Sequence, residues 1–173
     1  MACRKPPKPT ITLPGIGKVI GKQQNTRIGV PINVFRAIPY AKPPIGKLRF
    51  GLPQPLNHTS QTILDCTKGD STPCIQPDAL FPDCNMLIRG SEDCLYLNIY
   101  TPSFPQEDNG NANSMANLAV LVWFHGGAFC IGSNEMSFYG PDYLLDYGIV
   151  LVAVNYRLGP LGFLNLECEE APG

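Results

Sequence analysis

Two uninterrupted apolar runs constrain the fold of this chain more than any other feature of its sequence. They cover residues 118–124 (LAVLVWF) and residues 149–155 (IVLVAVN). A strand that is buried on both faces of a sheet is continuously apolar, whereas a half-exposed strand alternates apolar and polar residues. A glycine-rich loop and a short predicted helix at residues 141–147, which Gly148 ends, join the two runs. We therefore predict a parallel pair of strands that is buried on both faces.

The other elements are predicted to be short, because 18 prolines and 17 glycines interrupt the chain. Strands are expected at residues 11–13, 18–20, 32–38 and 95–100, and loops at residues 41–55, 65–89 and 103–117. Antiparallel strands followed by a parallel pair predict an α/β fold with a mixed sheet. The sheet is expected to be incomplete, because most of the helices that would cover it are missing.

Composition indicates a globular chain and excludes several kinds of partner. Hydrophobic residues make up 44% and charged residues 16%, which is typical of a folded domain. The formal net charge of −1 predicts no nucleic-acid partner. The apolar runs are far too short to cross a bilayer. The seven cysteines and two histidines show no zinc-type spacing, so we predict neither a metal nor a cofactor.

The beginning of the sequence bears on the cellular compartment. Residues 1–14 hold four prolines and no apolar core, so they do not resemble a secretory signal. We assign them to a disordered tail, an assignment that competes with the strand at 11–13, and residues 15–173 to one domain. If Met1 is the true start, the protein is expected to be cytoplasmic. Secretion is the alternative: the number of cysteines favours it, and Asn57 would then be a glycosylation acceptor.

The segment with the clearest chemistry directly follows the first apolar run. It is the loop His125-Gly126-Gly127-Ala128-Phe129. Adjacent glycines let the backbone turn sharply and leave N–H groups with no side chain in front of them. Such groups can bind an oxygen that becomes negative during acyl transfer, and an HGG-type loop after a strand has this role in lipases and esterases. An ordinary strand-to-loop turn is the alternative.

Four further blocks of sequence resemble one known family. They are SEDCLYLNIY at residues 91–100, IPYA at 38–41 with the prolines and Arg49-Phe50 that follow, NYRLG at 155–159, and GFL at 162–164. In order and spacing they resemble the type-B carboxylesterase and cholinesterase family, from about Gly17 to the last residue. Residues 139–143 and 171–173 are most similar to insect members. The resemblance implies the N-terminal portion of an α/β-hydrolase that cleaves small carboxylic esters with a Ser, Glu (or Asp) and His triad.

The resemblance also implies roles for the glycine-rich loop. Two backbone donors of the oxyanion hole match Gly127 and Ala128, and Gly126 shapes the turn. Ala128 replaces a glycine that is common in the family, but its N–H group is retained. His125 matches a structural position, because in this chemistry the catalytic base follows the nucleophile in the chain.

Among the cysteines, the family pairs Cys94 with an earlier residue, which matches Cys74. This disulfide would close a loop of about 20 residues, worth about 3 kcal/mol on the chain-entropy model. Cys66 and Cys84 are the alternative pair. We expect Cys130 to be a small buried side chain rather than a nucleophile.

Two positions outside the loop also follow from the resemblance. Arg49 and Glu92 match a buried salt bridge of the family, so Arg49→Ala would be expected to prevent folding; two solvated charges are the alternative. Ala37 stands where the family usually has glycine.

The nucleophile that this chemistry requires is not found in the sequence. No serine lies in a Gly-x-Ser-x-Gly motif, and Ser71 has only the first glycine. A triad acid and histidine are not recognised either. We therefore expect a fragment of a carboxylic ester hydrolase that is inactive by itself. The alternatives are a non-catalytic cholinesterase-like adhesion protein and a short binding or decoy protein. We also expect the strand at 149–155 to present an open apolar edge that promotes aggregation.

Overall fold

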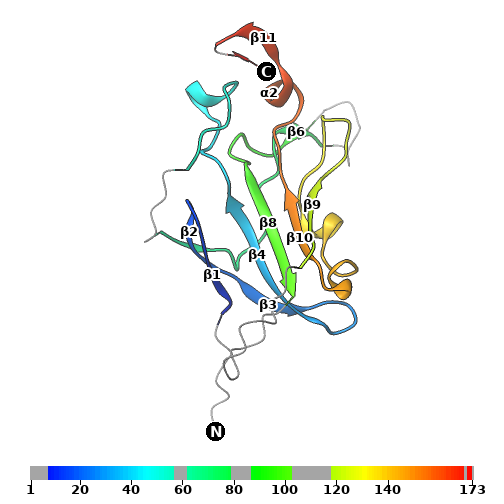
Figure 1. Cartoon of the computed structure of the whole chain (residues 1–173). Coiled ribbons are helices and arrows are strands. Elements are labelled where there is room, and N and C mark those ends of the chain that lie inside the picture. Colours follow the sequence, from blue (N-terminus) through cyan, green and yellow to red (C-terminus); the bar gives the residue numbers. More distant parts are fainter. Residues whose placement is uncertain (1–7, 57–61, 79–86, 103–117, 170, 173) are drawn as a thin grey trace.

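A mixed five-stranded sheet forms the centre of the molecule (Figure 1). The computed structural model describes residues 8–56, 62–78, 87–102, 118–169 and 171–172. The strand order is β3 (Lys22–Asn25), β4 (Pro31–Pro39), β8 (Tyr96–Pro102), β10 (Val150–Val154) and β9 (Val120–Phe124). The first four strands pair antiparallel, and β10 pairs parallel with β9. The predicted mixed sheet and its parallel pair are therefore confirmed.

The two strands of the parallel pair differ in burial, which corrects two predictions. Strand β10 pairs with β8 on one side and β9 on the other, so its edge is not open. Strand β9 is the edge, and each of its side chains is exposed, including Trp123 at 40% and Phe124 at 61%. The apolar run was expected to be buried on both faces. It is not, because the side chains of β9 point to the two faces of the sheet, and the described chain leaves both faces largely uncovered there.

Strand β4 supplies side chains to hydrophobic clusters on both faces of the sheet, because successive strand residues point in opposite directions. Ile32 and Val34 pack with Tyr100 on one face. Phe35 and Ile38 pack on the other face. These two residues share a face although they are three positions apart, because a β-bulge shifts the register between them.

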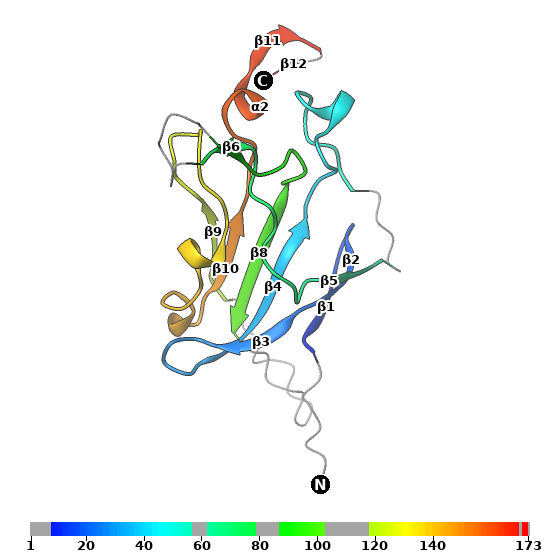
Figure 2. The same cartoon turned by 180° about the vertical axis from the view of Figure 1, so that it is seen from behind.

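A smaller sheet packs against the second of these faces (Figure 2). Its order is β1 (Thr10–Leu13), β2 (Gly17–Ile20) and β5 (Ile63–Asp65). Val19 of β2 contacts the cluster of Phe35 and Ile38. Strand β1 confirms the strand predicted at 11–13, so the assignment of a disordered tail is wrong for Thr10–Leu13. Residues 1–7 lie outside the described part.

The remaining elements are short. They are η1 (Gly46–Leu48), β6 (Gln76–Pro77), β7 (Ile88–Arg89), α1 (Met136–Tyr139), η3 (Leu145–Tyr147), α2 (Gly159–Phe163), β11 (Asn165–Cys168) and β12 (Ala171–Pro172). The helix predicted at 141–147 is reduced to η3, which Gly148 ends with a φ of 70° as expected. Within the described residues, no helix is long and apolar enough to span a membrane.

Candidate functional site

The glycine-rich loop lies at the carboxyl end of β9, beside the carboxyl end of β10. Parallel strands end at the same edge of a sheet, and the segments that follow them meet there. In both cartoon views this edge also carries β6 and α2 (Figures 1 and 2). Tyr156, which follows β10, contacts His125, which follows β9. The sequence placed the loop correctly after its strand but gave no sign of this contact.

The surroundings of His125 fit a structural role. Its side chain is buried, its Nδ1 lies 2.9 Å from the carbonyl oxygen of Gly126, and its ring stacks on Tyr156 at 4.5 Å. The Tyr156 hydroxyl donates a hydrogen bond of 2.7 Å to the carbonyl oxygen of His125. Burial lowers the pKa of the imidazole, and its Nε2 is buried without a partner among the described residues. A neutral imidazole with hydrogen on Nδ1 satisfies these contacts, whereas a proton on Nε2 would be buried without an acceptor.

The loop itself has an unusual backbone. Gly127 has a φ of 122°, and a side chain there would clash with the carbonyl oxygen of Ile131. Ala128 and Phe129 follow with φ values of 52° and 60°, a region that L-residues rarely adopt. The carbonyl oxygen of Gly127 accepts the N–H groups of Cys130 (3.0 Å) and Ile131, which closes a tight turn. Within the described part of the chain, the N–H groups of Gly127 and Ala128 have no acceptor. They are therefore available to a ligand.

A hollow of about 340 Å³ adjoins this loop. Its lining combines loop residues with residues of α1, β6 and β7: Gln76, Asp78, Arg89, Gly126, Gly127, Ile131, Gly132, Ser133, Phe138 and Tyr139. This volume is in the usual range for a small-molecule site. Gly126 and Gly127 line it as the sequence suggested, and Ala128 lies outside the lining.

The described serines near this hollow are engaged elsewhere. The Ser133 hydroxyl donates a hydrogen bond of 2.6 Å to Glu135, and Ser71 bonds the amides of Asn134 and Asn155. No serine hydroxyl among the described residues is bonded to a histidine. The described residues of this region therefore offer donors for a negative oxygen, and no serine among them is activated by a histidine.

The cysteine pairing follows the prediction. Cys74 and Cys94 form a disulfide, which confirms the pair that the resemblance implies. The alternative pair is not formed, since Cys66 is a free, buried thiol. Burial, together with the nearby charge of Asp65, raises the pKa of that thiol to about 11. Cys130 is exposed, so its predicted burial is wrong.

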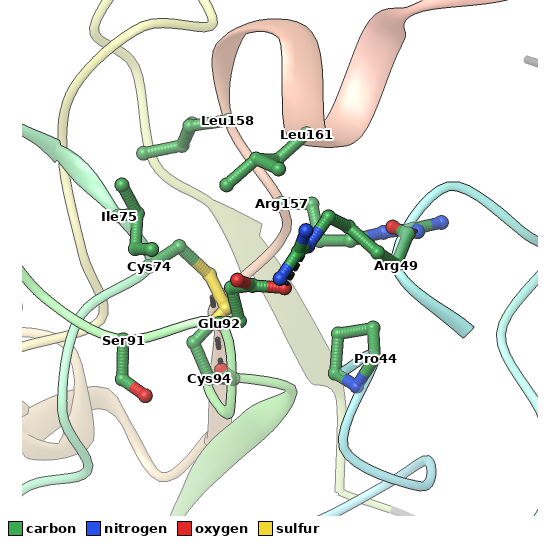
Figure 3. A pocket seen from close by; sticks show the side chains of 10 residues that line it. All are labelled: Pro44, Arg49, Cys74, Ile75, Ser91, Glu92, Cys94, Arg157, Leu158 and Leu161. Carbon is green, nitrogen blue, oxygen red and sulfur yellow. Dashed lines mark hydrogen bonds and ion pairs between the residues drawn. A yellow bond between two sulfur atoms is a disulfide. The ribbon is translucent and has the colours of Figure 1, made fainter. Parts of the chain in front are cut away.

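The ion pair of Arg49 and Glu92 is present but is not buried. Arg49 Nε lies 2.7 Å from Glu92 Oε2, and the Arg49 side chain is 45% exposed (Figure 3). The hydrogen bond and charge of Glu92 raise the pKa of the Arg49 guanidinium above its ordinary value. Arg157 was missed in the sequence: its Nη1 donates to the carbonyl oxygens of Arg49 (2.9 Å) and Gly51 (3.0 Å). It thereby holds the backbone of the segment that carries the pair.

Two other predictions concern a glycosylation site and a metal site. Asn57 lies outside the described residues. Among the residues that are described, no group of histidine, cysteine, aspartate and glutamate side chains is arranged to hold a metal ion.

Comparison with known proteins identifies the family. The Carboxylesterase family matches residues 7–173. The chain is 37% identical to juvenile hormone esterase of Tribolium castaneum over 171 residues, which is 99% of this chain and 27% of the relative. It is 41% identical to para-nitrobenzyl esterase of Bacillus subtilis, over 87% of this chain and 28% of the relative.

Solved structures give the same result for the fold. The juvenile hormone esterase of Manduca sexta with OTFP covalently attached superposes with a TM-score of 0.78 at 34% identity, covering 96% of this chain and 29% of that one. A thermophilic PNB esterase superposes with a TM-score of 0.72 at 38% identity, covering 91% of this chain and 30% of that one. This chain thus spans less than a third of each protein compared. It belongs to the carboxylesterase family, and its mixed sheet is part of an α/β-hydrolase fold.

Proposed function

We propose that this chain supplies the oxyanion loop of a carboxylic ester hydrolase, and that polypeptide outside these 173 residues supplies the nucleophile. The observation that carries the proposal is the free pair of N–H groups on Gly127 and Ala128, at the carboxyl edge of the sheet. These are the positions that the resemblance to the family assigned to the oxyanion hole.

The chemistry of the proposed site follows from these donors. A nucleophile that attacks an ester carbonyl carbon pushes electrons onto the carbonyl oxygen, which becomes an oxyanion. The N–H groups of Gly127 and Ala128 donate hydrogen bonds to that oxygen. Losing one donor of this kind costs about 3–4 kcal/mol of transition-state stabilisation. The hydrogen bonds from the N–H groups of Cys130 and Ile131 to the Gly127 carbonyl oxygen hold the turn that carries these donors before substrate arrives.

The substrate class is a small, largely apolar carboxylic ester. Ile131, Phe138 and Tyr139 give the hollow apolar walls, and its volume of about 340 Å³ suits the acyl or alcohol group of such an ester. The similar proteins are named as esterases of juvenile hormone and of para-nitrobenzyl esters. The adhesion alternative would leave the free N–H groups of the loop without a role, and no observation favours it.

The test begins with the transcript that encodes Gly173. We expect its reading frame to continue into a Gly-x-Ser-x-Gly motif, and the longer product to hydrolyse p-nitrophenyl acetate. The 173-residue chain alone should show no turnover above the buffer rate. A longer product with the motif but without esterase activity, or activity in the 173-residue chain, would contradict the proposal.

The compartment is a further part of the proposal. A disulfide such as Cys74–Cys94 persists in an oxidising environment, so we propose secretion, the alternative, in place of the cytoplasmic location expected from residues 1–14. Asn57 would then carry a glycan. Treatment of the natural protein with a glycosidase should lower its mass, whereas an unchanged mass would favour the cytoplasm.

A further inference from the structure

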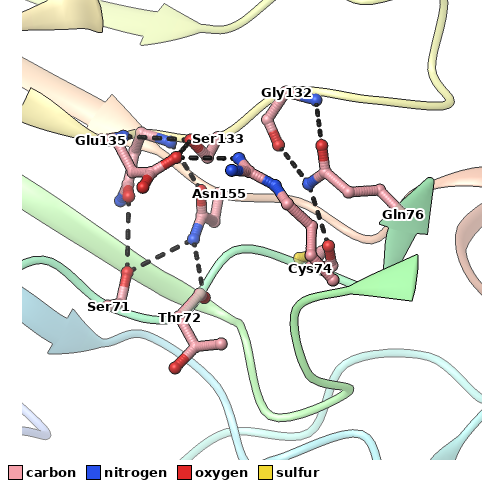
Figure 4. A network of polar contacts seen from close by, with 10 residues as sticks. Ser71, Thr72, Cys74, Gln76, Gly132, Ser133, Glu135 and Asn155 are labelled. Atoms are coloured by element: carbon pink, nitrogen blue, oxygen red, sulfur yellow. Dashed lines mark hydrogen bonds and ion pairs between the residues drawn. The ribbon is translucent and has the colours of Figure 1, made fainter. Parts of the chain in front are cut away.

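Gln76 makes an unusually complete set of contacts at the end of the oxyanion loop. Its side chain is buried, with 4% of its surface exposed. Its Oε1 accepts the N–H group of Gly132 at 2.7 Å, and its Nε2 donates to the carbonyl oxygen of Gly132 at 2.7 Å and to that of Cys74 at 2.9 Å. Figure 4 shows the carboxamide facing both the N–H group and the carbonyl oxygen of Gly132.

Gly132 is the residue at which the oxyanion loop closes. Its φ is 118°, and a side chain there would clash with His125 Nδ1 and lie 2.6 Å from the carbonyl oxygen of Gly126. The end of the loop therefore packs directly against its beginning. Any movement of Gly132 moves the segment that carries the N–H groups of Gly127 and Ala128.

The segment that carries Gln76 is itself held in place by other contacts. Gln76 is in β6, which pairs with Arg89 of β7, and Cys74, two residues earlier, is anchored by its disulfide to Cys94. Arg89 makes a second tie to the segment after the loop, through a 2.9 Å ion pair with Glu135. The disulfide-closed segment 74–94 therefore supports the loop at two points.

We propose that Gln76 is a positioning residue: its carboxamide holds Gly132 and thereby orients the N–H groups of Gly127 and Ala128. This inference rests on the proposed ester hydrolase function. A different role, in which Gln76 only joins two loops and contributes stability, predicts different kinetics. Orientation acts on the transition state, because the charge on the oxygen develops there and is small in the bound ester.

The kinetic test uses the longer product that carries the nucleophile. Gln76→Ala removes both contacts to Gly132 and should lower kcat between about 10-fold and about 100-fold with KM nearly unchanged, since small displacements of catalytic groups have effects of this size. The affinity for a trifluoromethyl ketone, which forms an oxyanion-like adduct, should fall by the same factor as kcat/KM. Gln54→Ala is the matched control, because Gln54 is exposed and its side chain donates only to the nearby carbonyl oxygen of Leu52 among the described residues.

Gln76→Glu gives a second readout that a purely structural role would not produce. An ionised carboxylate accepts the N–H group of Gly132 but repels its carbonyl oxygen, whereas a protonated one both accepts and donates. The activity of this variant relative to wild type should therefore recover as pH falls. A constant ratio across pH, together with an unchanged kcat in Gln76→Ala, would overturn the proposal.

Hydrogen exchange of the same protein tests Gln76 whether or not esters are hydrolysed. The amides of Cys130 and Ile131, which donate to the Gly127 carbonyl oxygen in wild type, should exchange at least about 10-fold faster in Gln76→Ala, while those of β8 and β10 stay unchanged. Equal protection of the loop in a folded variant would refute the positioning role. An inactive wild type with faster loop exchange in the variant would instead contradict the esterase proposal. It would still support the positioning of Gly132 by the Gln76 carboxamide.

Discussion

The left-handed backbone at Ala37 allows a sharp test of the bulge in β4. Ala37 has a φ of 58°, and its N–H group donates a 2.9 Å hydrogen bond to Asn98 Oδ1. This conformation costs an L-residue about 1–2 kcal/mol, and glycine adopts it freely. Glycine loses roughly 0.5–1 kcal/mol more than alanine through the entropy of the unfolded chain. Ala37→Gly should therefore raise the free energy of unfolding by about 0.5 kcal/mol.

Ala37→Val makes the expected order of stability unmistakable. A β-branched side chain is an outlier at positive φ, so this variant should lose at least about 1 kcal/mol. The expected order of stability at this position, with glycine the most stable and valine the least, reverses the order normally found in strands. Val152, half-buried in β10, is the matched control and should show the normal order, with Val152→Gly the least stable.

Equilibrium urea unfolding followed by tryptophan fluorescence measures these differences. Trp123 is the only tryptophan in the sequence and contacts Tyr139 with ring centroids 5.6 Å apart, so its emission reports on folding. The reasoning fails if Ala37→Gly is the least stable and Ala37→Val the most stable variant of the series. That result would mean that the residue is in ordinary strand conformation.

Four further perturbations have expected outcomes. Cys94→Ala, which removes the disulfide, should lower the free energy of unfolding by about 3 kcal/mol in urea, and reductant should then have no further effect. The buried Cys66 thiol keeps its proton to about pH 11 in the folded state, while the unfolded thiol ionises near its ordinary pKa. The unfolded state therefore binds fewer protons between these values, and stability should fall as pH rises from about 9 to about 11; Cys66→Ala should weaken this decline. Arg157→Ala should lower the melting temperature more than Arg49→Ala, because Arg157 holds two backbone carbonyls and Arg49 is 45% exposed. The opposite order would support the strongly stabilising salt bridge that the family resemblance suggested. The 173-residue chain should self-associate through the open edge of β9, and Val122→Lys should raise its monomer fraction in size-exclusion chromatography, whereas an unchanged profile would exclude this edge.

The elements that the sequence predicted well are those with a clear local pattern. The alternation at 95–100 predicted β8, and the two apolar runs predicted β9 and β10 as strands. Strands β6 and β7 were missed, because each has two residues and so carries no periodicity. The burial of β9 was wrong for another reason: whether the side chains of a strand are covered depends on what packs against the faces of the sheet, which the residues of the strand do not specify.

The same division applies to the candidate site. The turn at Gly126 and Gly127 was visible because the need for glycine is local. The contact between Gln76 and Gly132 spans 56 positions, and nothing in either segment indicates it. A buried glutamine beside a cysteine has no distinctive sequence signal. Only the fold, which brings β6 to the carboxyl edge of the sheet, reveals what the carboxamide binds.

If the proposed function is right, the support of the loop explains how the oxyanion donors can be in place before the nucleophile is present. On the proposed function, the donors must already point at the position of the oxyanion, because preorganised dipoles stabilise charge without reorganising during the reaction. Tyr156 fixes the start of the loop through His125, and Gln76 fixes its end through Gly132. Between these two points, the backbone has positive φ at Gly127 and the next two residues. Each of these contacts is made by residues of this chain, so on the proposed function the geometry of the oxyanion hole does not depend on the segment that brings the nucleophile.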